Sequence, residues 1–495
     1  MSRIIVIGSG FGGMGSALRL LAHGHDVTII EKLDKPGGRA YVFEQDGFTF
    51  DAGPTVITAP WLIHELFELF GKRSEDYLRI IPIDPFYRIY FSDQSYFEYN
   101  NDQAFIEENI RKFNPADVEG YRAFMEKTKP IFEKGFVELA DQPFLTIGSM
   151  LRVVPDLLKL RSHQSVYSFV SGFIKDPRLR MVFTFHPLLV GGNPFHTTSI
   201  YSMIHYLEKE WGVHYSMGGT GEVIRAFAQL FTGEGGSMLL DTEVASIDVQ
   251  DGRARGVRLA NGEFLEADAV VSNADVAYTY LHMIDATHRR KYTDAKVKRM
   301  RYSMSLFVIY FGTTRRYPEI AHHDIILSHR YRELLEDIFR NKVLAEDFSL
   351  YLHRPTSTDT SMAPEGCDTF YALMPVPHNA SGIDWSTEAP RFRDRVFDFL
   401  ERYYLPDLRK HLATERVFTP DDFETRLNSH LGSAFSVEPI LTQSAWFRPH
   451  NRSEDVENLY FTGAGTHPGA GLPGVLSSAR IIGNLIGPAA GGAGT

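Results

Sequence analysis

Apolar runs and a helical repeat at the amino end of the chain predict a strand, a helix and a second strand. Residues 4–7 are Ile-Ile-Val-Ile, a continuous apolar run typical of a parallel strand buried on both faces. Apolar side chains then recur at helical spacing over residues 17–21. A second apolar run, residues 27–30, ends at Glu31. This order predicts the start of an α/β fold with a parallel sheet.

Three glycines lie between the first strand and the helix. Gly8, Gly10 and Gly13 fit the spacing G-x-G-x-x-G. The first glycine permits a tight turn, the second lets a pyrophosphate approach the backbone, and the third lets the helix pack on the strand, so that phosphates lie at the helix N-terminus. Glu31 is placed to accept hydrogen bonds from ribose hydroxyls and would repel a 2′-phosphate. We therefore expect an adenine dinucleotide site.

Two following segments favour FAD over NAD. Residues 35–39 and 47–55 resemble the flavin-facing segments of amine-oxidase-like flavoproteins, and the pair Asp46-Gly47 predicts a hairpin turn that returns the chain to the cofactor. The residues expected to contact FAD here are Gly38, Arg39, Gly53, Pro54 and Thr55.

A distant segment, residues 458–482, is predicted to be a strand, a glycine-rich loop and a helix whose start carries Pro473. We expect the positive helix end to lie beside the flavin ring. The expected contacts are Gly465, Thr466, Gly474 and Val475. Gly469, Gly471 and Gly474 also fit G-x-G-x-x-G, but no strand adjoins Gly469, so we expect no second nucleotide fold for NADPH.

Composition is typical of one large enzyme with several lobes. The 495 residues are 43% hydrophobic, and a net charge of −11 argues against nucleic-acid binding. The single cysteine, Cys367, excludes an intrachain disulfide and a multi-thiolate metal site, which fits a reducing compartment. A strand at the N-terminus predicts no signal peptide, and no apolar run has the length of a membrane span. We expect a cytoplasmic protein.

The predicted elements divide the chain into three bodies. Residues 1–75, 212–285 and 430–495 are expected to form a discontinuous, Rossmann-like FAD-binding domain. Residues 76–101 and 286–429 are expected to form a mixed-sheet substrate-binding domain, and residues 102–211 a helical subdomain. Within the first body, residues 243–271 predict a four-strand meander. The tail from residue 487 is of low complexity, and we expect it to be disordered.

Longer motifs, spread over essentially the whole chain, resemble the bacterial-type phytoene desaturases. They are residues 7–13, 36–40, 50–55, 188–194, 272–275, 435–439, 443–450 and 463–474. The resemblance implies an FAD-dependent enzyme that dehydrogenates phytoene or a related acyclic carotene to products such as neurosporene or lycopene. It also implies that the backbone of Val244 meets adenine. Thr466-His467 stands where many related flavoproteins carry an acidic residue, so the phosphate contact there is expected from backbone or hydroxyl.

A carotene has no polar handle, so its binding requires an apolar tunnel, which the 36 Phe and 23 Tyr of this chain suit. Arg152 is our candidate for assisting the proton or shielding a developing cation at the reacting carbons. No catalytic triad or metal cluster is indicated. We interpret His322-His323 as a solvated loop pair.

Residues 145–185 carry six Lys or Arg against two Asp, interleaved with Leu, Val and Phe. This pattern predicts an interfacial surface, and therefore a peripheral membrane protein.

Oxygen or a quinone is the expected electron acceptor. The sequence leaves open whether the chain forms a homo-oligomer. The alternatives are another carotenoid flavoenzyme (a hydroxycarotene desaturase or a carotene isomerase), an amine oxidase, or a non-catalytic lipid escort protein. The intact Gly8, Gly10, Gly13 and Glu31 argue against the escort.

Overall fold

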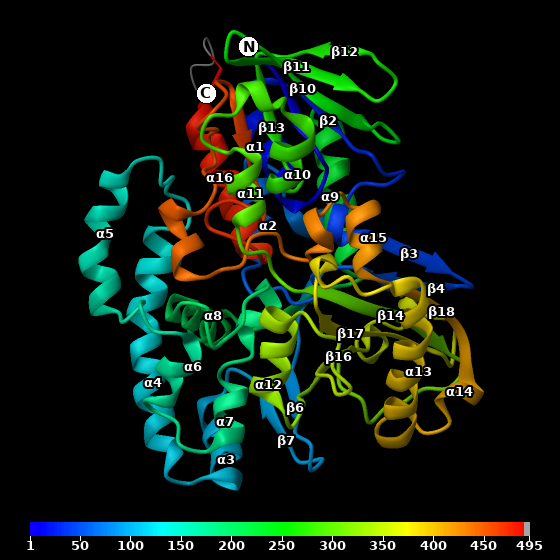
Figure 1. Cartoon of the computed structure of the whole chain (residues 1–495). Helices are drawn as coiled ribbons and strands as arrows, with labels where there is room; N and C mark the ends of the chain where they lie inside the picture. Colours follow the sequence, from blue (N-terminus) through cyan, green and yellow to red (C-terminus); the bar gives the residue numbers. More distant parts are fainter. Residues whose placement is uncertain (490–495) are drawn as a thin grey trace.

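The first apolar runs form the centre of a five-stranded parallel sheet in the computed structural model, which describes residues 1–489 (Figure 1). The strand order is β19-β13-β1-β2-β9. Ile4 and Val6 of β1 pack into the core on one face, whereas Ile5 and Ile7 pack into the core on the other. Both faces are therefore covered, as the unbroken apolar run predicts. The strands are β1 (Arg3–Ile7), β2 (Asp26–Ile30), β9 (Ser237–Leu239), β13 (Ala269–Ser272) and β19 (Leu459–Phe461).

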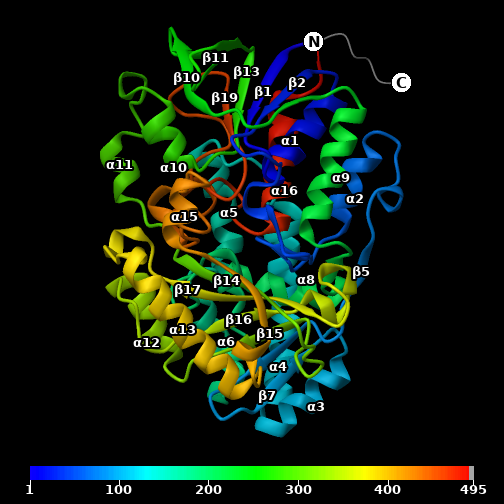
Figure 2. The ribbon, with the colours of Figure 1, turned by 90° about the vertical axis from the view of Figure 1, so that its right-hand side faces the viewer.

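Four helices cover one face of this sheet, and α1 packs against both α16 and α9 (Figure 2). They are α1 (Phe11–Ala22), α2 (Trp61–Glu68), α9 (Thr220–Gly233) and α16 (Leu472–Ile486). A three-stranded antiparallel sheet covers the other face, with α10 (Val276–Tyr278) and α11 (Asp294–Arg299) beside it. Its strands are β10 (Val244–Gln250), β11 (Arg253–Leu259) and β12 (Phe264–Glu266).

The predicted four-strand meander is wrong in its last strand. β10, β11 and β12 form it, but Ala269–Ser272 leaves the meander and pairs in parallel with β1 and β19. All four residues of this strand are buried, which suits a central position between two covered faces.

A seven-stranded mixed sheet forms the second body, in the order β18-β14-β17-β16-β15-β6-β7. Helix α13 (Trp385–Tyr403) packs on one face of it. The strands are β6 (Tyr87–Tyr90), β7 (Tyr96–Tyr99), β14 (Ser305–Thr313), β15 (His323–Ile326), β16 (Leu350–His353), β17 (Asp368–Val376) and β18 (Leu412–Phe418). The smaller elements around it are α12 (Tyr331–Glu336), α14 (Leu408–His411) and α15 (Pro420–Thr425).

The predicted hairpin is present between β3 (Val42–Gln45) and β4 (Phe48–Asp51). Asp46 (φ 53°) and Gly47 (φ 83°) both have positive φ, as a two-residue turn between twisted strands requires. A short pair, β5 (Ile80–Pro82) with β8 (His214–Ser216), flanks the helical lobe.

Six helices form a separate lobe, at the lower left in Figure 1. They are α3 (Gln103–Phe113), α4 (Asp117–Phe132), α5 (Ile147–Lys159), α6 (Val166–Ser171), α7 (Pro177–Val182) and α8 (Met203–Trp211). Over residues 1–489, no helix has both the length and the apolar character needed to cross a bilayer. The tail expected to be disordered lies, from residue 490 on, outside the described residues.

Candidate functional site

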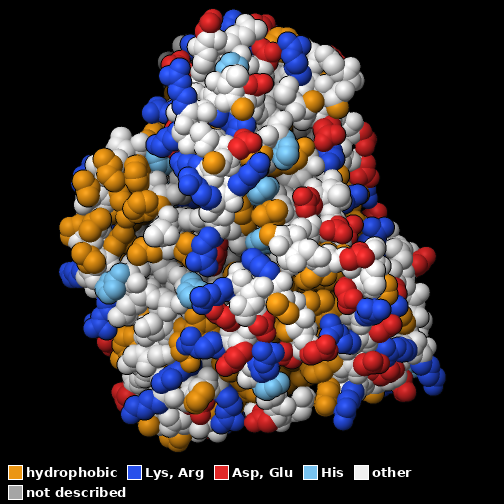
Figure 3. Space-filling view, in the orientation of Figure 1, with side chains coloured by type: hydrophobic (Ala, Val, Ile, Leu, Met, Phe, Trp, Pro, Cys, Tyr) orange, Lys and Arg blue, Asp and Glu red, His pale blue; other side chains and the backbone are white. Residues whose placement is uncertain are grey.

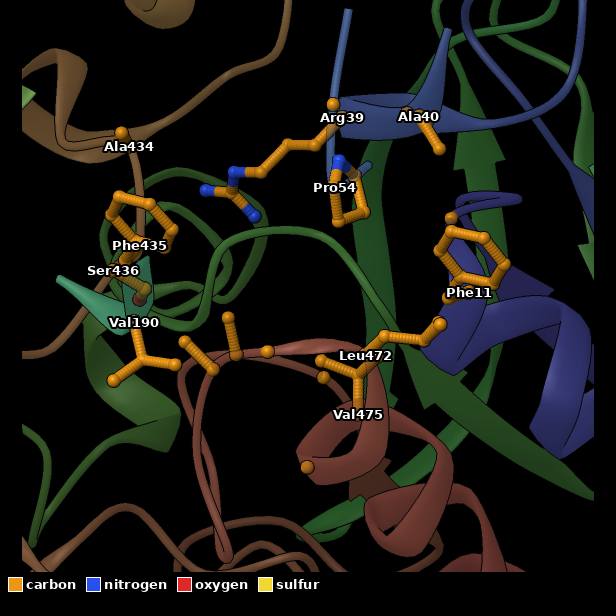
Figure 4. Close-up of a pocket in the computed structure, with 18 of the residues that line it drawn as sticks. Phe11, Arg39, Ala40, Pro54, Val190, Ala434, Phe435, Ser436, Leu472 and Val475 are labelled. Atoms are coloured by element: carbon orange, nitrogen blue, oxygen red, sulfur yellow. The ribbon is translucent and has the colours of Figure 1, made fainter. Parts of the chain in front are cut away.

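A cavity of about 440 Å³ lies where the parallel sheet, the seven-stranded sheet and the helical lobe meet (Figure 4). The carboxyl ends of the parallel strands open into it, which is where open α/β sheets bind ligands. Most residues expected to bind the cofactor line it: Gly8, Gly10, Glu31, Gly38, Arg39, Gly53, Pro54, Thr55, Val244, Gly465, Gly474 and Val475. Gly13 and Thr466 do not line it, and neither does Arg152, the residue expected to act at the reacting carbons.

At two of the three motif glycines, Gly10 and Gly13, a side chain would collide with its surroundings. A Cβ atom at Gly13 would stand 2.0 Å from the carbonyl oxygen of Gly8, so Gly13 allows the first turn of α1 to close onto the strand end. A Cβ atom at Gly10 would stand 2.9 Å from Oδ1 of Asn273, which lies under the loop. Gly10, Phe11 and Gly12 line the cavity, so the backbone at the start of α1 faces it, as a dinucleotide phosphate site requires.

Glu31 is buried at the end of β2, with 6% of its surface exposed. Its Oε2 accepts hydrogen bonds from the backbone N–H (2.8 Å) and the hydroxyl (2.6 Å) of Ser9, and its Oε1 accepts one from the N–H of Leu33 (2.9 Å). A carboxylate offers about four acceptor positions, so these three bonds leave capacity for a ribose hydroxyl. Glu31 thus also holds the loop that follows β1.

Arg39 extends across the cavity toward Phe435 (Figure 4). Its Nη2 donates to Oγ of Ser429 (2.9 Å), and its Nε finds no partner among the described residues. Burial lowers the pKa of Arg39, and the nearby Asp275 carboxylate opposes this shift. An arginine stays charged in proteins, so its free donor suits an anionic group in the cavity.

The carboxyl-terminal loop enters α16 with its first residues, Leu472 and Val475, at the cavity (Figure 4). The hydroxyl of Thr466 bonds instead to Ser478 (3.2 Å) and to the carbonyl of Gly463 (3.3 Å), which leaves only backbone to face a cofactor here. The start of α16 carries unpaired amides and the positive end of the helix dipole.

Arg448 has a structural role that was not predicted from the sequence. Its guanidinium is fully buried and donates to four carbonyl oxygens: Val437, Gln443, Ala464 and Thr466. It fixes the loop before α16 against the segment at residues 437–443. No local pattern marks such a role, because the four acceptors are backbone atoms.

The prediction that His322-His323 is a solvated loop pair is wrong. His322 and His323 are 4% and 0% exposed, because β15 begins at His323 and lies between β16 and β6 inside the sheet. A pair of polar residues beside an apolar run gives no sign of which sheet position it takes.

Residues 11–482 match the family described as flavin containing amine oxidoreductase. The chain is 52% identical over 487 residues to the lycopene-forming phytoene desaturase of Pseudescherichia vulneris, covering 98% of this chain and 99% of that one. It is 44% identical over 488 residues to the neurosporene-forming phytoene desaturase of Cereibacter sphaeroides, covering 98% of this chain and 94% of that one.

Solved structures agree on the fold. An oxidoreductase from Methanosarcina mazei has a TM-score of 0.64 at 16% identity, covering 96% of this chain and 98% of its own. Cyclohexylamine oxidase from Brevibacterium oxydans has a TM-score of 0.60 at 17% identity, covering 98% of this chain and 99% of its own. The glycine loop and the free Nε of Arg39 fit FAD, which is the cofactor of this protein. The chain belongs to the flavin-containing amine oxidoreductase family, and within it to the bacterial-type phytoene desaturases.

Proposed function

We propose that this chain dehydrogenates phytoene, or a closely related acyclic carotene, with FAD as the hydride acceptor, and forms a more conjugated carotene such as neurosporene or lycopene. Similarity to lycopene- and neurosporene-forming phytoene desaturases over 97–98% of the chain carries this proposal.

The cavity supports an apolar substrate. Beyond the glycine loop most of its wall residues are aliphatic or aromatic, and burial of a polyene there stabilises the complex by about 25 cal/mol per Å² of apolar surface. These wall residues come from the helical lobe and from the seven-stranded sheet: Leu188, Leu189, Val190, Ile204, Met304, Leu306, Leu327 and Leu373.

The protein contributes position and electrostatics. When bound, the flavin supplies the hydride acceptor. The start of α16 and the Arg39 guanidinium both place positive charge at the cavity, where it would stabilise negative charge on the bound cofactor. The apolar wall keeps water from the reacting carbons. Arg152 is exposed on α5 and outside the cavity, where its Nε donates to the carbonyl of Gly148 (3.4 Å). This position favours a role at a surface over a role at the reacting carbons.

Helix α5 supports docking on a membrane. It presents Ile147, Leu151 and Leu158 to solvent with 50%, 62% and 58% of their surface exposed, and Met150 is its one buried residue. Figure 3 shows apolar side chains gathered at the left edge of the molecule, where Figure 1 places α5. Exposed Arg152, Lys159 and Arg161 accompany this apolar face. Such a pairing suits an anionic lipid interface, which is also where a carotene partitions.

Two variants test the docking face. The double substitution Leu151→Asp and Leu158→Asp should reduce co-sedimentation with anionic liposomes, whereas Val343→Asp, at a residue 51% exposed elsewhere, should not. Reversing the charges of Arg152, Lys159 and Arg161 together should weaken binding most at low salt, because charges are screened over about 8 Å at physiological ionic strength. Parent-like binding by both variants would refute docking through α5.

We also propose that oxygen or a membrane quinone reoxidises the flavin. Within residues 1–489, the glycine motif between β1 and α1 directly follows a parallel strand, whereas the motif at Gly469 does not, since β19 ends at Phe461. The second motif therefore gives no support for a separate nicotinamide site, and we expect the electrons to leave to an acceptor that diffuses to the flavin.

The function as a whole is tested by incubating purified protein and FAD with phytoene in liposomes. Visible-absorbing carotenes should form at the expense of phytoene, and unchanged phytoene in the presence of bound FAD would refute the proposal.

A further inference from the structure

A half-buried lysine and a buried histidine, Lys342 and His378, meet outside the cavity. Lys342 follows α12 and the helical turn Asp337–Asn341, and it takes the left-handed conformation (φ 57°), which at such a position is most often that of glycine. His378 lies just beyond the end of β17 and is 5% exposed. Nζ of Lys342 lies 2.9 Å from Nε2 of His378. Neither residue lines the cavity, so this contact belongs to no part of the site described above.

The backbone determines which nitrogen of His378 carries the proton. The N–H of Ala380 donates to Nδ1 of His378 (3.3 Å), which caps the short turn Asn379–Ser381. Nδ1 therefore carries a lone pair. Burial lowers the pKa of His378 to about 3, so the ring is neutral and its single proton is on Nε2. Nε2 of His378 thus donates to Nζ of Lys342.

This hydrogen bond requires an uncharged lysine. An ammonium group has three donors and no acceptor, whereas a neutral amine has the lone pair that the N–H of His378 needs. Protonation of Lys342 would set two donors face to face, either at Nζ or, if the ring proton moved to Nδ1, at Ala380. The geometry therefore favours the free amine. Burial acts in the same direction and lowers the pKa of Lys342 to about 8.

The neighbouring charges do not provide Lys342 with an ion pair. The carboxylate whose charge acts on Lys342 is that of Glu438, but its Oε2 and Oε1 accept from Nε (2.8 Å) and Nη2 (3.2 Å) of Arg301. Arg301 is half-exposed, and its own charge opposes protonation of Lys342. His430, which acts on His378, also has its pKa lowered by burial. Within residues 1–489, His378 is therefore the side chain that binds Nζ of Lys342.

We propose that Lys342 binds carbon dioxide as a carbamate. The lone pair of Nζ attacks the carbon of CO₂, so that a C–N bond forms and the π electrons of one C=O bond move to its oxygen. One N–H proton then passes to water, and the step needs no oxidant or reductant. Only an uncharged amine has the lone pair that this attack requires.

The surroundings of Lys342 suit the product as well as the free amine. Nε2–H of His378 can donate to a carbamate oxygen, and the guanidinium of Arg301 supplies positive charge nearby. Because Lys342 is half-buried, a small uncharged electrophile reaches Nζ more readily than a large one. This inference does not depend on which carotene is the substrate.

Chemical trapping tests the proposal. Holoenzyme is equilibrated with isotope-labelled bicarbonate at about pH 8, treated with triethyloxonium ion, which ethylates carbamates, and mapped by peptide mass spectrometry. About half of Lys342 is uncharged at this pH, against less than about 1% of a lysine with the usual pKa of about 10.4, so its label should exceed that of ordinary lysines at least about 10-fold. Lys35 and Lys298 are the controls, since both are exposed and pair with carboxylates. Label at Lys342 no higher than at these two would overturn the proposal.

His378→Asn tests the source of the reactivity. Asparagine is also a good cap for the turn at residues 379–381, but it lacks the ring N–H, so the label at Lys342 should fall about fivefold, the usual effect of one lost hydrogen bond. His163→Asn, at an exposed histidine elsewhere, should be labelled like the parent. Equal label in His378→Asn and the parent would overturn the proposal.

A second measurement covers the case in which His378→Asn does not fold. The parent is acetylated with acetic anhydride over a range of pH, and the rate at each lysine is read from the peptide map. Acetylation of Lys342 should have its midpoint at about pH 8, well below that of Lys35 and Lys298. A midpoint at about 10.4, the usual lysine value, would overturn the proposal.

Discussion

Glu31→Gln separates the two roles of Glu31 in the cofactor site. Glutamine keeps one oxygen, which can still accept both bonds from Ser9, but its amide nitrogen then faces the N–H of Leu33. One buried donor without a partner costs about 1–3 kcal/mol of stability. A lost charge-assisted bond to a ribose hydroxyl costs about 1.5–3 kcal/mol of binding, which corresponds to about 10- to 150-fold weaker FAD affinity.

The assay is the quenching of FAD fluorescence on titration of apoprotein, with thermal unfolding of the same apoprotein measured in parallel. Glu44→Gln is the control, since Glu44 is exposed and, among residues 1–489, pairs only with Lys35 (3.2 Å). Glu31→Gln should lower both FAD affinity and apoprotein stability, and Glu44→Gln neither. FAD affinity within about threefold of the parent in Glu31→Gln, a difference below about 0.7 kcal/mol, would show that Glu31 is purely structural and refute the ribose contact.

Three further outcomes follow. Gly13→Ala should abolish FAD retention, because its methyl would stand 2.0 Å from the carbonyl of Gly8, whereas Gly233→Ala, with open space around it, should retain FAD fully; retention by both contradicts the loop assignment. Burial raises the pKa of Asp51 to about 7, so the folded state keeps a proton that the unfolded state releases, and stability should fall as pH rises from about 4 to about 7. Asp51→Asn should remove about 2 kcal/mol of that fall between pH 5 and 7 in urea unfolding, and a parent-like pH profile would contradict this. Turnover should proceed without nicotinamide and respond to quinone or oxygen supply; a strict requirement for NAD(P)⁺ in anaerobic, quinone-free assays would contradict the proposed acceptor.

Local signals predicted the parts of the fold that local chemistry determines. The run at residues 4–7, the glycines after it and the pair Asp46-Gly47 each favour one backbone shape, and the structure has that shape at all three. The family resemblance, carried by motifs along the chain, is confirmed by the two phytoene desaturases at 52% and 44% identity.

What could not be predicted depends on contacts between distant residues. The strand at residues 269–272 looks like the end of a meander, and only pairing with β1 and β19 gives it a central place. His322 and His323 are polar, yet partners about 30 residues away, at His353, bury them. Thr466 and Arg448 act on backbone carbonyls, which no side-chain pattern records.

The most direct test of the central claim is anaerobic reduction of the bound flavin by carotene. Holoenzyme is mixed with phytoene-loaded liposomes without oxygen or quinone, and the oxidised flavin absorption is followed against liposomes without phytoene. The account predicts bleaching only with phytoene, with one new carotene double bond formed per FAD reduced. Bleaching by putrescine or cyclohexylamine and none by phytoene would contradict it.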